Sequence, residues 1–180
     1  AEGEVQQLCC IRNPKTTESE YLEIITRKTA KLFQAAAHSG AVLAKADERS
    51  ETALRDYGLH LGLSFQLIDD LLDYEGDASI MGKNVGDDLA EGKVTLPVID
   101  ALRQCSKEDR AFICKAITSG GVENLPQMIS VIKSTNALTY TAKLASSERC
   151  KAVECLKKVP DSAYKSAMET LINFAVNRRH

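Results

Sequence analysis

The chain has 180 residues, enough for one globular domain with a substantial hydrophobic core. Its net charge of −2 and its aromatic content of 5%, without tryptophan, exclude the basic field and the stacking surfaces of a typical nucleic-acid-binding protein. No apolar run approaches the roughly 18 residues of a membrane span, and no signal peptide opens the sequence, so we expect a soluble, cytoplasmic protein.

The spacing of apolar residues predicts helices along the whole chain, and therefore an all-α fold. Thr17 and Glu20 resemble a capping box, and Thr95 is a candidate N-cap with Pro97 in the first turn. The predicted helices cover residues 1–10, 18–46, 48–75, 95–104, 107–118, 122–133, 135–158 and 161–178.

The second predicted helix carries polar residues on its apolar stripe. When Tyr21, Ile25 and Leu32 are followed at helical spacing, Lys28 and Thr29 face inward. A lysine in that position needs an anion, unless its stem packs inside while its ammonium group reaches water.

The third predicted helix ends in a run that is apolar except for Gln66 and three aspartates. On a helix, Gln66, Asp69 or Asp70, and Asp73 project in roughly one direction, so like charges repel one another. A hard cation such as Mg²⁺ would resolve this conflict, because it binds carboxylate oxygens together with water and substrate phosphates. The alternative is an acidic face in contact with solvent.

A glycine-punctuated polar segment follows over residues 76–93 and predicts a loop of the kind that closes over a ligand. Lys83 and Lys93 in this segment could bind phosphate as point charges, although each could equally be solvated.

The other polar candidates carry no chemistry. The six cysteines form no Cys-x-x-Cys pair, so we expect free thiols in a reducing compartment. The three histidines have no cysteine or carboxylate at metal-ligand spacing, so we expect each to be solvated or hydrogen-bonded.

Four motifs occur in order along the chain, namely Lys28-Thr29, Phe65-Gln66-x-x-Asp69-Asp70-x-x-Asp73, Gly82-Lys83-x-x-Gly86-Asp87-Asp88 and Lys93. With this order and spacing the chain resembles the trans-polyprenyl diphosphate synthases, and residues 3–97 are most similar to the bacterial octaprenyl branch. The resemblance implies the helical bundle of the isoprenoid synthases, with residues 1–180 as the C-terminal portion of a single domain. It also implies that a first aspartate-rich motif lies upstream of residue 1.

The resemblance further implies a Mg²⁺-dependent prenyltransferase. Such an enzyme elongates an allylic diphosphate, such as farnesyl diphosphate, with isopentenyl diphosphate to a long-chain product, here octaprenyl diphosphate for quinone side chains. The implied metal ligands are Asp69, Asp70 and Asp73. The implied diphosphate-binding residues are Lys28, Thr29, Gln66, Lys83 and Lys93, of which the first three also serve catalysis. A homodimer is implied for the full-length protein, and we expect the 180 residues alone to be inactive.

Two other functions remain open. A class I terpene cyclase shares the helical fold and the Mg²⁺-assisted ionisation of a diphosphate, although Lys28-Thr29 and Gly82-Lys83 argue against it. A non-catalytic helical partner subunit of a prenyl synthase could keep the acidic motif as a relic.

Overall fold

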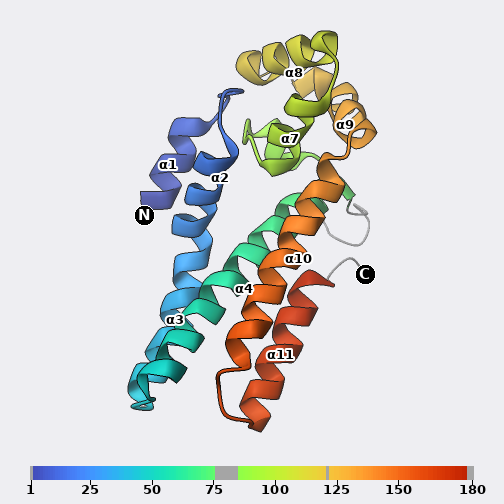
Figure 1. Ribbon diagram of the computed structural model, residues 1–180. Coiled ribbons are helices and arrows are strands. Elements are labelled where there is room, and N and C mark those ends of the chain that lie inside the picture. Colours follow the sequence, from blue (N-terminus) through green and yellow to red (C-terminus); the bar gives the residue numbers. More distant parts are fainter. Residues whose placement is uncertain (1, 76–84, 121, 178–180) are drawn as a thin grey trace. The chain divides into compact units, whose positions relative to one another are not determined.

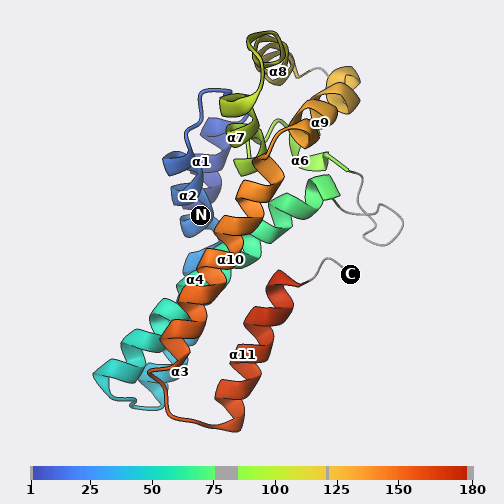
Figure 2. The same ribbon diagram turned by 45° about the vertical axis from the view of Figure 1, so that its right-hand side comes forward.

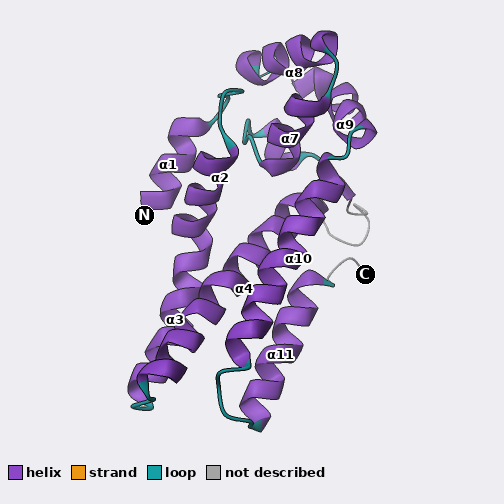
Figure 3. Ribbon diagram, viewed as in Figure 1, coloured by secondary structure: helices purple, strands orange, loops and turns teal. Residues whose placement is uncertain are grey.

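The computed structural model describes residues 2–75, 85–120 and 122–177, and every regular element in these ranges is a helix (Figures 1 and 3). This confirms the predicted all-α class. The elements are α1 (Glu2–Cys10), α2 (Glu18–Ile25), the π-helical turn η1 (Thr26–Ala30), α3 (Lys31–Leu43), α4 (Glu48–Glu75), α6 (Asp87–Ala90), α7 (Leu96–Gln104), α8 (Lys107–Ser119), the 3₁₀ turn η2 (Val122–Asn124), α9 (Leu125–Ser134), α10 (Ala137–Leu156) and α11 (Ala163–Val176). None of these helices is both long and apolar enough to cross a bilayer.

Capping side chains set several helix starts. The predicted capping box at the start of α2 is present, because the Thr17 amide donates to the Glu20 carboxylate at 2.7 Å and the Glu20 amide donates to Thr17 Oγ1 at 3.2 Å. Helix α4 begins where predicted, after Asp47, whose Oδ1 accepts a hydrogen bond from the Ser50 amide at 2.8 Å. Thr95 precedes α7 in an extended conformation, but its side chain makes no capping hydrogen bond.

Two features differ from the predicted elements. The helix expected over residues 18–46 is interrupted by η1, in which the Lys31 amide donates to the Thr26 carbonyl, five residues earlier. The segment expected to be a loop over residues 76–93 contains the short helix α6. Lys83 of that segment lies outside the described residues.

The chain divides into two compact units, and α4 contributes to both of them. One unit comprises Ala1–Ile24 and Asp69–Ala142. Helix α7 lies at its core, because every residue from Leu96 to Leu102 is buried. Only Asp100 among these carries a charge, and its carboxylate accepts a hydrogen bond from Gln104 one helical turn later.

The other unit comprises Ile25–Ile68 and Lys143–His180. Figures 1 and 2 both show α10 running beside α4, and the Ser64 hydroxyl of α4 donates to the Ala145 carbonyl of α10 at 2.9 Å. Tyr57 and Leu61 of α4 pack into a buried apolar cluster with residues of α10 and α11. The single domain expected for residues 1–180 stays a prediction.

Candidate active site

The three aspartates at the C-terminal end of α4 lie in different environments. Asp69 is half-buried, and its carboxylate forms no hydrogen bond or ion pair with any residue that the structure describes. Asp70 is only 3% exposed. Its Oδ2 accepts a hydrogen bond at 2.5 Å from the hydroxyl of Tyr21, which is also buried. Of these two carboxylates, Asp69 is therefore the better placed to bind a ligand.

Asp73 is half-buried and short of partners. Its Oδ1 accepts a long hydrogen bond of 3.4 Å from the Asp88 amide, whereas its buried Oδ2 has no hydrogen-bond partner among the described residues. Burial raises the pKa of Asp73 from 3.8 to about 6, and the negative charges of Asp88 and Asp87 add to that effect. A carboxylate in this situation favours a cation beside it.

Helix α6 lies against the end of α4. The Gly86 amide donates to the Asp73 carbonyl at 2.8 Å, and Gly86 has a φ of +85°, a conformation that glycine adopts without strain. The Lys93 ammonium contacts Asp88 Oδ1 at 2.7 Å and Glu91 Oε2 at 2.8 Å. Burial alone would lower the pKa of Lys93, but these two hydrogen bonds outweigh it and raise the pKa. Lys93 therefore carries a fixed positive charge beside the acidic group, by which we mean the carboxylates of Asp69, Asp73, Asp87 and Asp88.

A second group of predicted residues lies in the other unit. The Thr29 hydroxyl of η1 donates to Gln66 Oε1 of α4 at 2.8 Å, so two residues predicted 37 positions apart are brought into contact. Lys28 is half-buried in the same π-helical turn. Such turns widen a helix locally and are frequent at functional sites.

The acidic group fits a hard divalent cation that retains water. Among residues 2–75, 85–120 and 122–177, no three or more histidine, cysteine or acidic side chains are grouped closely enough to enclose a metal ion. Mg²⁺ does not need such a cage, since it usually binds one or two carboxylates and completes its shell with water and substrate phosphates. The half-buried carboxylates of Asp69 and Asp73, with the unpartnered Oδ2 of Asp73, are donors of that kind.

Two residues of this region were not predicted as site residues. Tyr21 was assigned only to the apolar stripe, and the signal that could have identified it is a hydroxyl on a stripe that otherwise carries apolar groups. Asp88 belongs to one of the four motifs but had no predicted role, although it connects Lys93 to Asp73. The Tyr21–Asp70 and Asp88–Asp73 contacts join residues 49 and 15 positions apart, so helical periodicity carries no information on them.

Comparison with known proteins gives concordant results. The model of the family described as "Polyprenyl synthetase" matches residues 1–132. Octaprenyl diphosphate synthase of Haemophilus influenzae is 42% identical over 181 residues, covering 100% of this chain. All-trans-nonaprenyl-diphosphate synthase (geranyl-diphosphate specific) of Rhodobacter capsulatus is 44% identical over 178 residues, covering 99% of this chain.

The similar solved structures are also polyprenyl synthases. A polyprenyl synthase from Caulobacter crescentus, crystallised with calcium and isoprenyl diphosphate, has a TM-score of 0.92 and 42% identity, and the match covers 99% of this chain and 55% of that chain. The chain likewise spans 55% of the Haemophilus influenzae relative and 54% of the Rhodobacter capsulatus one, which is about half of each.

Proposed function

Since the chain belongs to the polyprenyl synthetase family, we propose that it carries the part of a trans-prenyltransferase that holds the diphosphate of an allylic substrate. The complete reaction would elongate an allylic diphosphate, such as farnesyl diphosphate, with isopentenyl diphosphate. Relatives named octaprenyl and nonaprenyl diphosphate synthase support a long-chain product. Octaprenyl, for quinone side chains, and a homodimer of the complete protein are the finer parts of this proposal.

The proposed ligands of Mg²⁺ are Asp69 and Asp73, while Asp70 is oriented by Tyr21. When bound, the cation neutralises the charge that develops on the departing diphosphate. Lys93 adds positive charge beside these carboxylates, and Lys28 and Lys83 are proposed to contact the diphosphate as well. Preorganised charges of this kind stabilise an ionising transition state more than the bound substrate.

Thr29 and Gln66 are proposed to act on the allylic cation. The Thr29 hydroxyl donates to the Gln66 side-chain oxygen, which orders both groups before substrate binds. Oxygen dipoles held in this way can face a developing carbocation without further reorganisation. The attacking group is the double bond of isopentenyl diphosphate, so no side-chain nucleophile is needed.

One observation carries the metal-dependent part of the proposal: the half-buried Asp73 carboxylate lies beside Asp87 and Asp88 with one oxygen unpartnered. Repulsion among half-buried carboxylates costs free energy unless a cation is bound or a proton is taken up. The calcium and isoprenyl diphosphate of the Caulobacter crescentus structure support a divalent cation and a diphosphate as the ligands.

Titration calorimetry with pyrophosphate tests the proposal. We expect pyrophosphate to bind in the presence of Mg²⁺ and not in EDTA, and we expect Asp69→Asn and Asp73→Asn each to weaken binding about tenfold or more. Asp56→Asn is the matched control, since Asp56 lies on the same helix and pairs with Arg55 at the surface. Absence of Mg²⁺-dependent binding in the folded wild-type chain would favour a non-catalytic partner subunit instead.

A further inference from the structure

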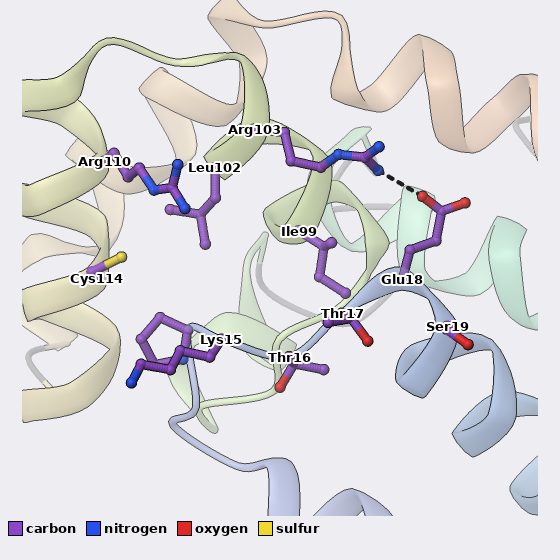
Figure 4. Close-up of a pocket in the computed structure, with 11 residues that line it drawn as sticks. Lys15, Thr16, Thr17, Glu18, Ser19, Ile99, Leu102, Arg103, Arg110 and Cys114 are labelled. Carbon is purple, nitrogen blue, oxygen red and sulfur yellow. Dashed lines mark hydrogen bonds and ion pairs between the residues drawn. The ribbon is translucent and has the colours of Figure 1, made fainter.

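A pocket of about 730 Å³ lies entirely within the unit that contains α1, α2 and α7–α9. Figure 4 shows it between the α1–α2 loop, with Lys15 and Thr16, and residues of α7 and α8. Its volume is within the range of about 300–1,000 Å³ that is typical of small-molecule sites. None of the residues assigned above to the diphosphate or the metal lines it.

The pocket carries an excess of positive charge. Arg103 of α7 is neutralised by Glu18, whose carboxylate lies 2.7 Å from its guanidinium group, and Figure 4 shows Arg103 turned toward that partner. The side chains of Lys15 and Arg110 also line the pocket, and neither forms an ion pair with a residue that the structure describes. With Glu18 cancelling Arg103, Lys15 and Arg110 leave two positive charges uncompensated.

The same pocket has an apolar side. Pro14 of the α1–α2 loop and Cys114 of α8 are half-buried and line it, and Ile99 and Leu102 of α7, each 5% exposed, line it as well. Exposed cations alone bind simple anions weakly, because water and salt compete for the charge. A ligand that also covers the aliphatic side adds the free energy of burying apolar surface.

From this combination we propose that the pocket is a second ligand site, which binds a dianionic phosphate ester or diphosphate attached to a compact apolar body. The two uncompensated cations match the charge of such a head group, and Pro14 and Cys114 contact the body together with the exposed atoms of Ile99 and Leu102. Binding here needs no divalent metal, since cationic side chains supply all the positive charge. The proposal therefore stands independently of the prenyltransferase assignment.

Protection of Cys114 from alkylation tests the proposal at the pocket itself. The chain is treated with iodoacetamide in EDTA, with or without hexyl phosphate, and the modification of each cysteine is followed by peptide mass spectrometry. We expect hexyl phosphate at millimolar concentration to slow alkylation of Cys114 and to leave that of exposed Cys150 on α10 unchanged. Hexanol and inorganic phosphate, each lacking one half of the ligand, should protect Cys114 far less.

Charge variants complete the test. We expect the double variant Lys15→Gln/Arg110→Gln to need about tenfold more hexyl phosphate for the same protection of Cys114. Lys107→Gln/Lys115→Gln is the matched control, because it removes the same charge from exposed positions of α8 that do not line the pocket. Circular dichroism is used to check that both variants fold.

Several outcomes would overturn the inference. One is that hexyl phosphate does not protect Cys114 in the wild-type chain, and another is that it protects Cys150 equally. The others are that the Lys15/Arg110 variant shows the same protection as the wild-type chain, or that inorganic phosphate protects as well as hexyl phosphate. Protection by hexyl phosphate that is lost in the Lys15/Arg110 variant and kept in the Lys107/Lys115 variant would support it, whatever the result of the pyrophosphate titration.

Discussion

Tyr21 and Asp70 form a buried hydrogen bond of 2.5 Å between α2 and the end of α4. Removing the hydroxyl would leave a buried carboxylate with one donor fewer, which costs about 1–3 kcal/mol of stability. We therefore expect Tyr21→Phe to lower the free energy of unfolding by that amount in urea titrations. Tyr164→Phe, at a position that is 84% exposed, should have no measurable effect, and equal behaviour of the two variants would contradict the structural role of Tyr21.

Glu148 provides a pH-dependent contribution in the other unit. It is 6% exposed, and its carboxylate lies 2.7 Å from His60 Nδ1 and 2.6 Å from the Lys151 ammonium. Burial alone would raise the pKa of Glu148, but the hydrogen bonds to His60 and Lys151 outweigh it and hold the pKa below its ordinary value of 4.5. The resulting stabilisation is present above pH 4.5 and is lost as the pH falls through the lower pKa of the folded state.

The variant Glu148→Gln tests the direction in which this stabilisation depends on pH. We expect the variant to be less stable than the wild-type chain by about 1 kcal/mol at pH 7, with the difference shrinking as the pH falls below 4.5. Thermal or urea unfolding followed by circular dichroism at several pH values measures it. Glu154→Gln is the control, because Glu154 lies on the same helix, α10, and forms an exposed ion pair with Lys157. A difference that stays constant down to pH 3 would show that the charge of Glu148 is not its cause.

At the scale of the elements, two glycines allow α4 to approach η1 and α3 closely. A Cβ atom at Gly62 would lie 2.6 Å from the Ala30 Cα, and one at Gly58 would lie 2.5 Å from the Phe33 carbonyl oxygen. Real Cβ atoms do not come so near to backbone, so the helices would have to separate. The close approach of Gly62 to Ala30 neighbours the Thr29–Gln66 hydrogen bond, because Ala30 follows Thr29 and Gly62 lies about one helical turn before Gln66.

Alanine substitution separates packing from helix propensity. Gly62→Ala should destabilise the chain by about 1–3 kcal/mol through overpacking, although alanine is the better helix former. Gly40→Ala on α3 should instead stabilise it by about 0.5–1 kcal/mol, because a Cβ there meets nothing within 4 Å. Urea unfolding of the two variants measures both signs, and stabilisation by Gly62→Ala would refute the close approach.

The sequence predicted where regular helices begin better than it predicted irregular features such as η1 and α6. The start of α4 is specified by Asp47 and that of α2 by Thr17 and Glu20, all of which act through bonds within three residues. The π-helical turn η1 was not predicted, because the prediction extended one unbroken 3.6-residue periodicity across residues 18–46. The short helix α6 is held by a bond from Gly86 to Asp73, a tertiary contact that local patterns do not contain.

For the candidate site, the sequence predicted residue types and their order but not their partners. Like charges at helical spacing pointed to Asp69 or Asp70, together with Asp73, as candidate ligands without any structure. That Asp70 is bonded to Tyr21, and that Asp88 lies between Lys93 and Asp73, depends on how distant segments pack. The roles of these residues in binding a diphosphate stay predictions.

At the scale of the whole molecule, the sequence contains Asp-Asp-x-x-Asp once, whereas the family resemblance implies two aspartate-rich motifs. We propose that this motif binds Mg²⁺ and pyrophosphate, and the resemblance implies that the other motif binds further Mg²⁺ on the allylic substrate. We therefore expect the 180-residue chain to bind pyrophosphate with Mg²⁺ and still not to elongate farnesyl diphosphate with radiolabelled isopentenyl diphosphate. Octaprenyl diphosphate synthase of Haemophilus influenzae, assayed in parallel, is the positive control. Elongation by the chain at a rate comparable to that of the control would show that one aspartate-rich motif suffices.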